Sequence, residues 1–463
     1  MGSEANLIDK LSRIVGAERI RTDPEHLEEV CWDALSASRI HPLKRPETAS
    51  PLCVVLPRST AEVREIVQLA NDEKVPMVPY GGGSGLMGGA ITLRPGIVLD
   101  TRAMNRVLEI DKEAFTVRAQ TGVVLESLEN RLNQDDLMLG HDPWTLPVAT
   151  VGGAISTNSL GYRGGKYGSM GDEVLGLEVV IPNGEILTTR AVPKSSTGIS
   201  LNRLFIGGEG CFGVITEATL RVFPLPEARS LRAVRFTSFE AGFEAIQRIY
   251  GLGLRPSLMD FGDDPTKVLS GAVLYIGFEG PKPVVKAEEN CALSVSEKAG
   301  GRQLPQEEAE TFWRDRHVIA RRFKENRLQR RAGRRDGVRW EWLHVALPTS
   351  RVLEFRKVAM EVLAERGIAL QESGLWTQPE LFSMRLAVEG REDERAQVRL
   401  EDALEDLLRL TQRMGGSMEY CHGVGIKLAP LMAEEHGYGL EVMRRIKKAL
   451  DPNNIMNPGK MGL

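Results

Sequence analysis

The sequence predicts an α+β protein with two domains, and three observations support this fold class. The chain has 463 residues, 42% of them apolar and 26% charged, which is enough material for more than one hydrophobic core. A strand–helix–strand pattern at residues 51–80 runs directly into a glycine-rich stretch. Beyond Pro226, strand-like runs alternate with amphipathic helices, which is typical of a sheet covered by helices on one face.

The first domain is predicted over residues 51–226, after a lead-in at 1–50. The lead-in contains an amphipathic helix around Leu7, Leu11 and Ile14. The domain opens with a strand at 51–59, a helix at 59–74 with Ser59 or Thr60 as N-cap, and a strand at 75–80. Further strands are expected where Val, Ile and Thr recur between turn residues, at 96–101, 115–122, 175–189 and 212–226.

The second domain is predicted over residues 227–425, with a C-terminal segment at 426–463. Its strands are expected at 231–238, 272–280, 340–348 and 381–390, and its helices at 239–250, 350–367 and 391–415. In the C-terminal segment, a helix at 440–450 should end before Pro452, because proline cannot continue a helix.

Composition excludes several classes of protein. A formal net charge of -4 provides no field that would attract a polyanion, so nucleic acid is not an expected partner. Five cysteines without CxxC spacing do not suggest a disulfide framework, which fits a reducing compartment. The N-terminus lacks the apolar core of a signal peptide, and no stretch approaches the roughly 20 apolar residues of a membrane span. We therefore expect a cytoplasmic protein.

A densely basic segment at residues 321–339 has two interpretations. It can be a solvated helix face or loop, or it can be a docking site for anionic lipid or an acidic partner. The charge pattern does not decide between them, so membrane contact is expected at most peripherally and through this segment. The oligomeric state is equally open, with a homodimer as one option.

A glycine-rich loop at residues 79–89 follows a buried strand. Glycine lets backbone N–H groups turn toward one anion and lets a diphosphate approach without meeting a Cβ, so the loop suits a pyrophosphate. It lacks the Gly-Lys-Ser/Thr ending of a Walker A loop, and no helix opens from it as in a Rossmann motif. A purely structural glycine turn is the alternative.

Two more stretches carry small residues and hydroxyls. Residues 141–168 include His141-Asp142-Pro143 and the run from Thr150 to Asn158, where a flat ring system and a ribityl chain would need close contact. Residues 207–216 lead from glycines into a β-branched strand.

Together the three stretches resemble the FAD-binding domain of the vanillyl-alcohol oxidase and p-cresol methylhydroxylase family. The resemblance extends from about Pro51 to residues 450–460, which look like the segment that returns from the cap domain to the flavin. It implies a two-subdomain FAD-binding domain and a cap with an antiparallel sheet. The implied FAD contacts are Gly81, Gly82, Gly83, Ser84, Gly85 and Leu86 on the pyrophosphate, then Pro143, Thr150, Gly152, Gly153, Ser156, Thr157 and Ile215, with Asn457 near the ring. Some members attach FAD through a histidine in the first loop; the matching residue here is Ser84, so we expect dissociable FAD.

Within this family the sequence is similar to the D-lactate and glycolate dehydrogenases and to the alkylglycerone-phosphate synthases. Both share a C-terminal His-Gly motif, which here is His422-Gly423. Imidazole ordinarily titrates near neutral pH and could take a hydroxyl proton while hydride leaves the same carbon for flavin N5, so His422 is the expected base. A histidine merely satisfied in the domain interface is the alternative.

Two departures bear on a metal. The 2-hydroxy-acid branch usually has Glu before this histidine and a distant histidine pair that complete a metal site. Here Cys421 replaces the Glu, and residues 372–390 contain no histidine. We therefore expect no bound metal. The synthase branch has a run of histidines of which only His422 remains.

Other side chains are candidates for substrate contact. Tyr420 matches a tyrosine that helps to ionise the phenol in the phenolic-alcohol oxidases, although a tyrosine that only packs is the alternative. Arg385, and Arg314 or Arg316, are candidates to pair with a substrate carboxylate, because a guanidinium fork matches it bidentately.

The leading hypothesis is an FAD-dependent oxidoreductase that takes hydride from a small 2-hydroxy acid of the D-lactate or glycolate class and passes electrons to an unidentified acceptor. The alternatives are an alkylglycerone-phosphate-synthase-like flavoenzyme without net oxidation, a phenolic-alcohol oxidase, and a flavin-binding subunit with no substrate of its own.

Overall fold

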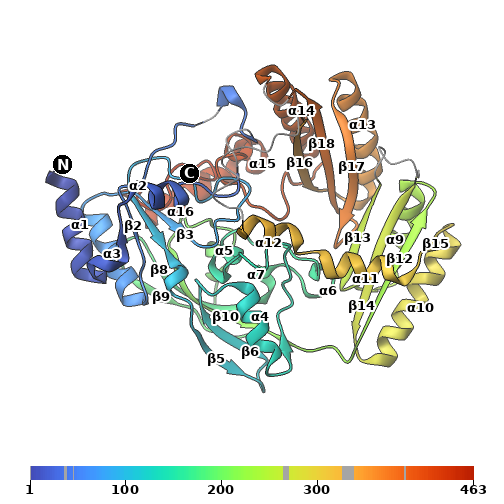
Figure 1. Ribbon diagram of the computed structural model, residues 1–463, viewed down its shortest axis with the longest axis horizontal. Helices are drawn as coiled ribbons and strands as arrows, with labels where there is room; N and C mark the ends of the chain where they lie inside the picture. Colours follow the sequence, from blue (N-terminus) through green and yellow to red (C-terminus); the bar gives the residue numbers. More distant parts are fainter. Residues whose placement is uncertain (1, 36–38, 45, 264–270, 326–337, 391–392) are drawn as a thin grey trace.

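The computed structural model describes residues 2–35, 39–44, 46–263, 271–325, 338–390 and 393–463. Its elements form two sheet systems that lie side by side (Figure 1). Small sheets from the first half of the chain lie at the left, next to both termini, and a large sheet from the second half lies at the right. The predicted α+β class, with an FAD-binding type of fold beside a sheet covered by helices, is confirmed.

The first small sheet has the strand order β1-β2-β4-β3. Strands β2 (Cys53–Val55), β4 (Ile97–Asp100) and β3 (Met77–Tyr80) are parallel, and β1 (Ile20–Arg21) is antiparallel to β2. Helices α1 (Gly2–Val15) and α3 (Thr60–Asp72) share a buried core with this sheet, and Ser59 caps α3 by accepting a hydrogen bond from the Glu62 amide. The lead-in thus contributes a strand and a helix to this core.

The second small sheet is antiparallel, with the order β5-β6-β10-β8-β9. Its strands are β5 (Val107–Asp111), β6 (Thr116–Gln120), β8 (Val174–Val180), β9 (Ile186–Thr188) and β10 (Val214–Arg221). Within the predicted strand range 175–189, a turn at Asn183-Gly184 joins β8 to β9, with Gly184 at φ 84°. The short elements around the two small sheets are α2 (Pro24–Val30), α4 (Leu125–Asn133), β7 (Leu137–Met138), α5 (Val151–Ser156), α6 (Gly164–Tyr167), α7 (Met170–Glu173), α8 (Asn202–Phe205) and β11 (Phe223–Pro224).

The large sheet has seven antiparallel strands in the order β15-β12-β14-β13-β17-β18-β16. They are β12 (Ala228–Phe236), β13 (Leu258–Asp263), β14 (Ala272–Gly280), β15 (Arg302–Gln303), β16 (Val338–Ala346), β17 (Ala369–Trp376) and β18 (Leu381–Glu389). Four long helices pack against this sheet: α9 (Phe239–Gly251), α10 (Lys282–Lys298), α13 (Val352–Glu365) and α14 (Glu394–Arg413).

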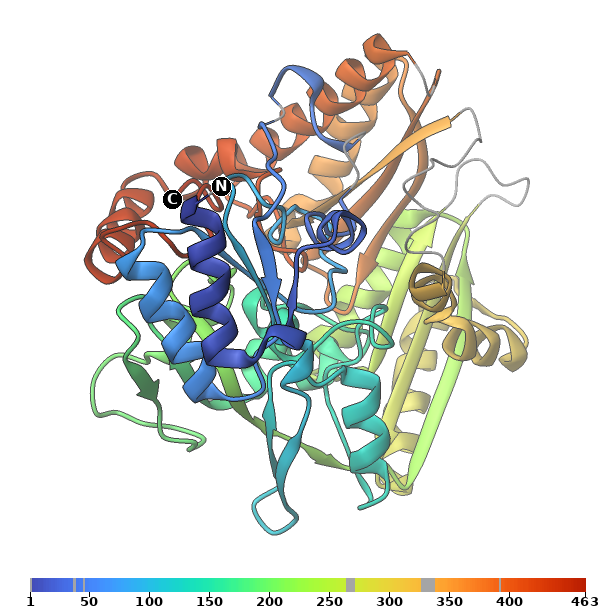
Figure 2. The ribbon, with the colours of Figure 1, turned by 60° about the vertical axis from the view of Figure 1, so that its left-hand side comes forward.

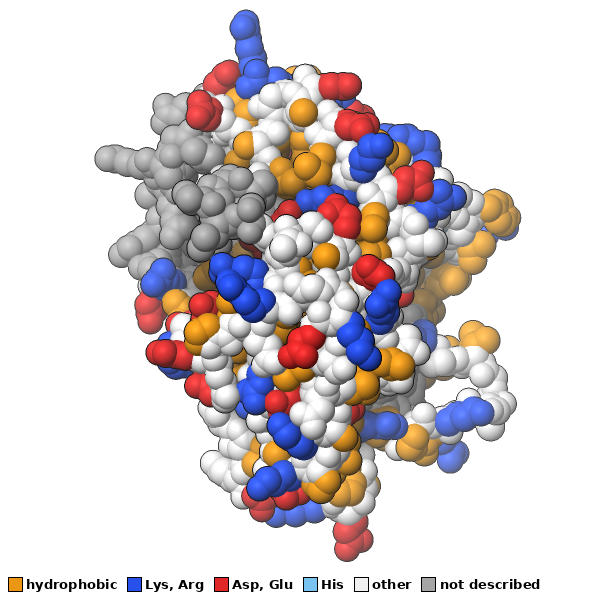
Figure 3. Space-filling view, turned by 90° about the vertical axis from the view of Figure 1, so that its right-hand side faces the viewer, with side chains coloured by type: hydrophobic (Ala, Val, Ile, Leu, Met, Phe, Trp, Pro, Cys, Tyr) orange, Lys and Arg blue, Asp and Glu red, His pale blue; other side chains and the backbone are white. Residues whose placement is uncertain are grey.

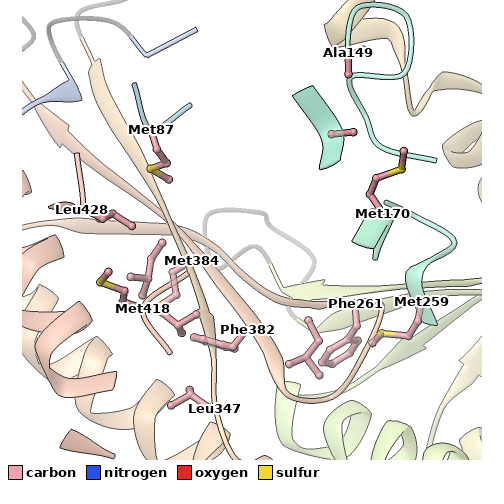
Figure 4. Packing of buried hydrophobic residues seen from close by; sticks show 14 of the residues in the cluster. Met87, Ala149, Met170, Met259, Phe261, Leu347, Phe382, Met384, Met418 and Leu428 are labelled. Atoms are coloured by element: carbon pink, nitrogen blue, oxygen red, sulfur yellow. The ribbon is translucent and has the colours of Figure 1, made fainter. Parts of the chain in front are cut away.

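Strand alternation sorts the side chains of this sheet onto two faces. Met259, Phe261, Phe382 and Met384 are at most 1% exposed and fill the core on the helix side (Figure 4). The opposite face carries α11 (Gln306–Asp315), which is followed by α12 (Val318–Glu325). The face of the large sheet that carries α11 is turned toward the small sheets, so it contributes to the candidate active site.

The C-terminal segment runs back to the first small sheet, as Figures 1 and 2 show. After α15 (Met432–His436) and α16 (Tyr438–Leu450), the chain pairs with β3: the Met77 amide donates to Ile455 O at 2.7 Å, and the Asn457 amide donates to Met77 O at 2.8 Å. The predicted helix at 440–450 ends where Pro452 requires.

The face over the helices of the large sheet shows acidic and basic side chains interspersed (Figure 3). Such a mixture is typical of solvated helices. Among the described residues, no helix is both long and apolar enough to cross a membrane. All five cysteines are free thiols. Most of the basic segment at 321–339 lies outside the described residues; of its visible part, Arg321 pairs with Glu126 at 2.7 Å.

Candidate active site

A cleft lies where the glycine-rich stretches of the first half meet the loop after α14. It encloses about 1240 Å³ of empty space, part of it open to solvent. Every predicted FAD contact except Asn457 lines it: Gly81, Gly82, Gly83, Ser84, Gly85, Leu86, Pro143, Thr150, Gly152, Gly153, Ser156, Thr157 and Ile215. The predicted base, His422, lines the same cleft.

The loop after β3 offers backbone donors that have no partner of their own. The amides of Gly81, Gly83, Ser84, Gly85 and Leu86 donate no hydrogen bond within the described part of the chain. Unpartnered amides in a concave loop suit the oxygens of a diphosphate. The loop therefore fits the cofactor that the motif predicts.

Close backbone packing explains the glycines of this loop. A Cβ on Gly82 would lie 2.3 Å from the carbonyl oxygen of Val148, and one on Gly81 would lie 2.4 Å from Oγ1 of Thr150. Thr150 also caps α5 by accepting a hydrogen bond from the Gly153 amide at 3.3 Å. The first and second motifs thus pack directly on each other.

The third motif joins the second motif to the C-terminal part of the chain. The Glu209 amide donates to Ser156 O at 2.9 Å, and the carboxylate of Glu209 accepts from the amides of Val424 and Gly425 at 2.6 and 2.9 Å. Burial raises the pKa of Glu209 to about 7, and these amides offset part of that effect. Glu209 therefore anchors the turn that follows His422.

A second contact fixes the same turn to the first motif. The amides of Ile426 and Lys427 both donate to Met87 O, at 2.9 and 3.1 Å. Gly425 lies at φ 52°, and a Cβ there would be 2.0 Å from that oxygen, so only glycine fits. These bonds hold His422 at the edge of the cleft.

Asn457 lies beside the cleft rather than in its lining. Its side-chain amide donates to Gly89 O at 2.8 Å and to Glu209 O at 2.7 Å, and the residue is 1% exposed. It therefore ties together the first motif, the third motif and the C-terminal segment.

His422 is held by the carboxylate of Glu419. Nδ1 of His422 lies 3.4 Å from Oε1 of Glu419, and that oxygen also accepts from the amides of Tyr420, Cys421 and His422 at 3.0, 2.8 and 3.0 Å. Burial would raise the pKa of Glu419, but the facing imidazole and these bonds hold it below its usual value. A fixed carboxylate behind an imidazole stabilises that imidazole once it gains a proton.

Tyr420 is paired with a second histidine. Its hydroxyl lies 3.1 Å from Nδ1 of His344 on β16, and the His344 ring lies 4.7 Å from the ring of His422. Burial, together with the proximity of His422, lowers the pKa of His344 to about 3. Burial, with Cys421 and Glu419 nearby, raises the pKa of Tyr420 well above its usual value. Both groups are therefore neutral at physiological pH.

The arginine candidates occupy different environments. Arg385 lies on the inner face of β18, with its guanidinium 5.5 Å from the Trp340 ring and 5.9 Å from the Trp342 ring. Arg316 instead donates to Asp142 at 3.0 Å, and Arg314 is exposed beside Asp315. Arg385 therefore lies beside Trp340 and Trp342, on the strand that pairs with the strand of His344. Arg316 is instead held in an ion pair with Asp142.

Asp142 is the centre of a buried charge network between the two sheet systems. Arg316 and His317 contact its carboxylate at 3.0 and 2.9 Å, and Arg163 lies 4.0 Å away. Burial opposes ionisation of Asp142, but Arg163, Arg316 and the hydrogen bond from His317 hold its pKa below the usual range. The network fixes α11 and α12 against residues 141–163.

Family models match most of the chain. An FAD binding domain matches residues 51–190, and the C-terminal domain of FAD linked oxidases matches residues 225–461. The second match alone covers more than half of the chain. The chain belongs to the FAD-linked oxidases.

Curated relatives of this FAD-linked oxidase include a glycolate oxidase subunit and a synthase. The glycolate oxidase subunit GlcD of Bacillus subtilis is 31% identical over 89% of each chain. An alkyldihydroxyacetonephosphate synthase of Trypanosoma brucei brucei is 26% identical, over 98% of this chain and 80% of its own.

Among solved structures, p-cresol methylhydroxylase with bound substrate shares the fold. The TM-score is 0.79, with 19% identity over 100% of this chain and 97% of that one. The predicted relationship to this flavoprotein family is confirmed, and the matched FAD binding domain indicates that the cofactor is FAD.

One group of described residues in this oxidase could hold a metal ion. Ligand atoms of Glu419, Cys421 and His422 lie within 4.8 Å of one another. Oε1 of Glu419 is already the acceptor for three backbone amides, and the thiol of Cys421 lies 3.3 Å from the His422 ring. The absence of a metal stays a prediction.

Sequence reasoning missed three residues of this site. No sequence pattern assigns a role to Glu419, and Glu209 lies within the glycine-containing stretch at residues 207–216. His344 lay in a predicted strand, where its spacing from Trp340 and Trp342 could have placed all three on one face.

Proposed function

We propose that this FAD-linked oxidase oxidises the carbinol carbon of a 2-hydroxy acid of the D-lactate or glycolate class to a 2-oxo acid. The observation that supports this proposal most directly is the His422–Glu419 pair at the edge of the FAD cleft. The name of the GlcD relative supports the same substrate class. FAD, when bound, supplies the hydride acceptor.

In this proposal His422 takes the hydroxyl proton of the substrate. Its Nδ1 faces Glu419, and in the proposal Nε2, which lies 3.4 Å from the Cys421 thiol, meets the substrate oxygen. The Glu419 carboxylate then stabilises the imidazolium, as a buried carboxylate hydrogen-bonded to the catalytic histidine does in other enzymes. The C2 hydrogen leaves the substrate as a hydride, which carries two electrons. An external acceptor must later remove these two electrons from the enzyme.

Two further side chains have supporting roles in the proposal. Arg385 binds the substrate carboxylate, because its Nε is buried without a hydrogen-bond partner and the residue forms no ion pair with any described residue. Tyr420, held neutral by burial, orients His344 through their hydrogen bond.

The test is the visible spectrum of the purified FAD-loaded protein under anaerobic conditions, while D- and L-2-hydroxy acids are added one at a time. Bleaching of the flavin band by one enantiomer supports the proposal and gives the stereochemistry. A band that stays oxidised with every acid would refute it.

The synthase reaction is the second candidate, because a synthase relative matches 98% of this chain. It involves no net oxidation, so turnover without any external electron acceptor would favour it. A strict requirement for an acceptor would exclude it.

A further inference from the structure

The face of the large sheet that is turned away from its helices is lined with aromatic rings. On β16, Leu343 and Val345 are buried on the helix side, so alternation places Trp342 and His344 on the opposite face. Arg385 of β18 pairs with Trp342 in the strand register and shares this face.

Ring contacts continue along this face from the proposed base. His344 lies 4.7 Å from His422 and 5.4 Å from Tyr420, measured between ring centroids. Tyr420 lies 6.4 Å from Trp376 at the end of β17, and Trp342 stacks on His344 at 5.5 Å on the other side. The row therefore has the His422 pair near its middle.

Rings from other elements close the row beyond Trp376. Tyr162, from the loop before α6, meets Trp376 edge to face at 5.5 Å. Phe312 of α11 lies 6.1 Å from Tyr162 and stacks on Tyr275 at 4.3 Å. All these side chains remain partly accessible although they lie between the two sheet systems. We call this lining the aromatic chamber: Trp342, His344, Tyr420, Trp376, Tyr162, Phe312 and Tyr275.

The two ends of the chamber differ in charge, because Arg385 is a cation whereas burial raises the pKa of Asp260 at the other end to about 7. Arg385 stands beside Trp342, and its Nε has no hydrogen-bond partner. Asp260 of β13 pairs in register with Trp376 at the other end. A substrate carboxylate is therefore drawn toward Arg385, which leaves the rest of the molecule to extend past His422 toward Trp376 and Tyr162.

We infer that the substrate is a 2-hydroxy acid whose side chain ends in a flat apolar ring seated between Trp376, Tyr420 and Tyr162. This inference rests on the proposed function and narrows its substrate class. A hydrogen or methyl side chain, as in glycolate or lactate, is too short to contact all three of these rings, whose centroids lie 5.5 and 6.4 Å apart. Aromatic side chains favour edge-to-face or offset partners at the centroid separations seen here.

The test compares kcat/KM for lactate and 3-phenyllactate of the reactive enantiomer, with the FAD-loaded enzyme and one artificial acceptor. We expect phenyllactate to be favoured roughly 10-fold or more, the scale on which a pocket distinguishes apolar groups. Trp376→Leu, and separately Tyr162→Leu, should lower the phenyllactate-to-lactate ratio of kcat/KM. Tyr438→Leu is the matched control, because that ring is 69% exposed on α16 and its loss should not change the ratio.

Binding of unreactive acids separates failure of this inference from failure of the proposed function. The shift of the flavin spectrum would be titrated with phenylacetate and with acetate. If no 2-hydroxy acid reduces the flavin, the proposed reaction is wrong, but tighter binding of phenylacetate would still support the aromatic chamber. Equal kcat/KM for lactate and phenyllactate, or equal affinity for the two unreactive acids, would overturn the inference.

Discussion

Nδ1 of His422 lies 3.4 Å from Oε1 of Glu419, and this oxygen also accepts hydrogen bonds from the three backbone amides of residues 420–422. The carboxylate therefore cannot rotate away without breaking these bonds. Glu209 holds the other side of the same turn through Val424 and Gly425. Two buried carboxylates from distant parts of the chain thus fix one imidazole at the edge of the FAD cleft.

Glu419 is expected to act as a positioning residue for the base. Glu419→Gln removes the negative charge behind the imidazole, so kcat for flavin reduction should fall at least roughly 10-fold with little change in KM. Glu419→Asp keeps the charge and should retain more activity than Glu419→Gln. Equal loss in kcat and in affinity for both variants would indicate a purely structural role.

Tyr420 discriminates between a hydroxy-acid enzyme and a phenol oxidase. Its raised pKa makes it a neutral partner of His344 rather than a phenolate. Tyr420→Phe should therefore leave oxidation of a 2-hydroxy acid within roughly 10-fold of wild type, below the usual loss of an acid–base catalyst. Steady-state rates with hydroxy acids and with para-alkylphenols measure this. A collapse of activity with hydroxy acids would assign Tyr420 a direct catalytic role.

FAD is expected to be bound without a covalent bond. Ser84 stands where a histidine link would form, and the loop offers unpartnered amides instead. Acid precipitation should release all of the flavin into the supernatant. Flavin absorbance that stays with the protein pellet would contradict this.

The close packing of the glycine-rich loop after β3 predicts that FAD binding depends on Gly82. Gly82→Ala would force a Cβ toward the Val148 carbonyl at 2.3 Å and should abolish FAD retention, whereas Gly439→Ala on α16, where the nearest neighbour is 3.5 Å away, should not. The ratio of flavin to protein absorbance after gel filtration reports the outcome. Full FAD occupancy in Gly82→Ala would show that the loop can open.

Asp142 is expected to stabilise the contact between the two sheet systems. Asp142→Asn leaves Arg316 without its anion between the sheet systems, whereas Arg163 keeps Glu129 at 3.1 Å, so the free energy of unfolding should fall by about 3–5 kcal/mol. Urea denaturation of the FAD-saturated protein measures this. Glu441→Gln breaks an exposed pair with Arg445 and should change stability by about 1 kcal/mol or less.

The same residue predicts a pH dependence. The pKa of Asp142 is lowered in the folded protein, so the folded state binds fewer protons here than the unfolded chain does. The contribution of Asp142 is therefore complete above the unfolded pKa of about 4 and is lost as the pH falls below it. Wild type should lose stability more steeply than Asp142→Asn below pH ~4. Parallel curves for the two proteins would refute this.

The sequence predicted the site through its glycine motifs but predicted the large sheet incompletely. Strands β13 and β17 were not predicted; in β13, Asp and Gly are residue types depleted in strands, although this strand lies between two others. The cofactor residues could be predicted because close backbone approach demands glycine, which leaves a mark in the sequence. The His344–Tyr420 bond depends on where a loop meets a strand from 76 residues earlier, which no local pattern reveals.

The rate of flavin reduction in His422→Asn, followed by anaerobic stopped-flow with the reactive 2-hydroxy acid, tests the proposed mechanism most directly. If His422 is the base, the rate constant should fall by roughly 10²–10⁴ relative to wild type while FAD remains bound. A rate constant equal to that of wild type would show that His422 takes no proton from the substrate, and the proposed mechanism would be wrong.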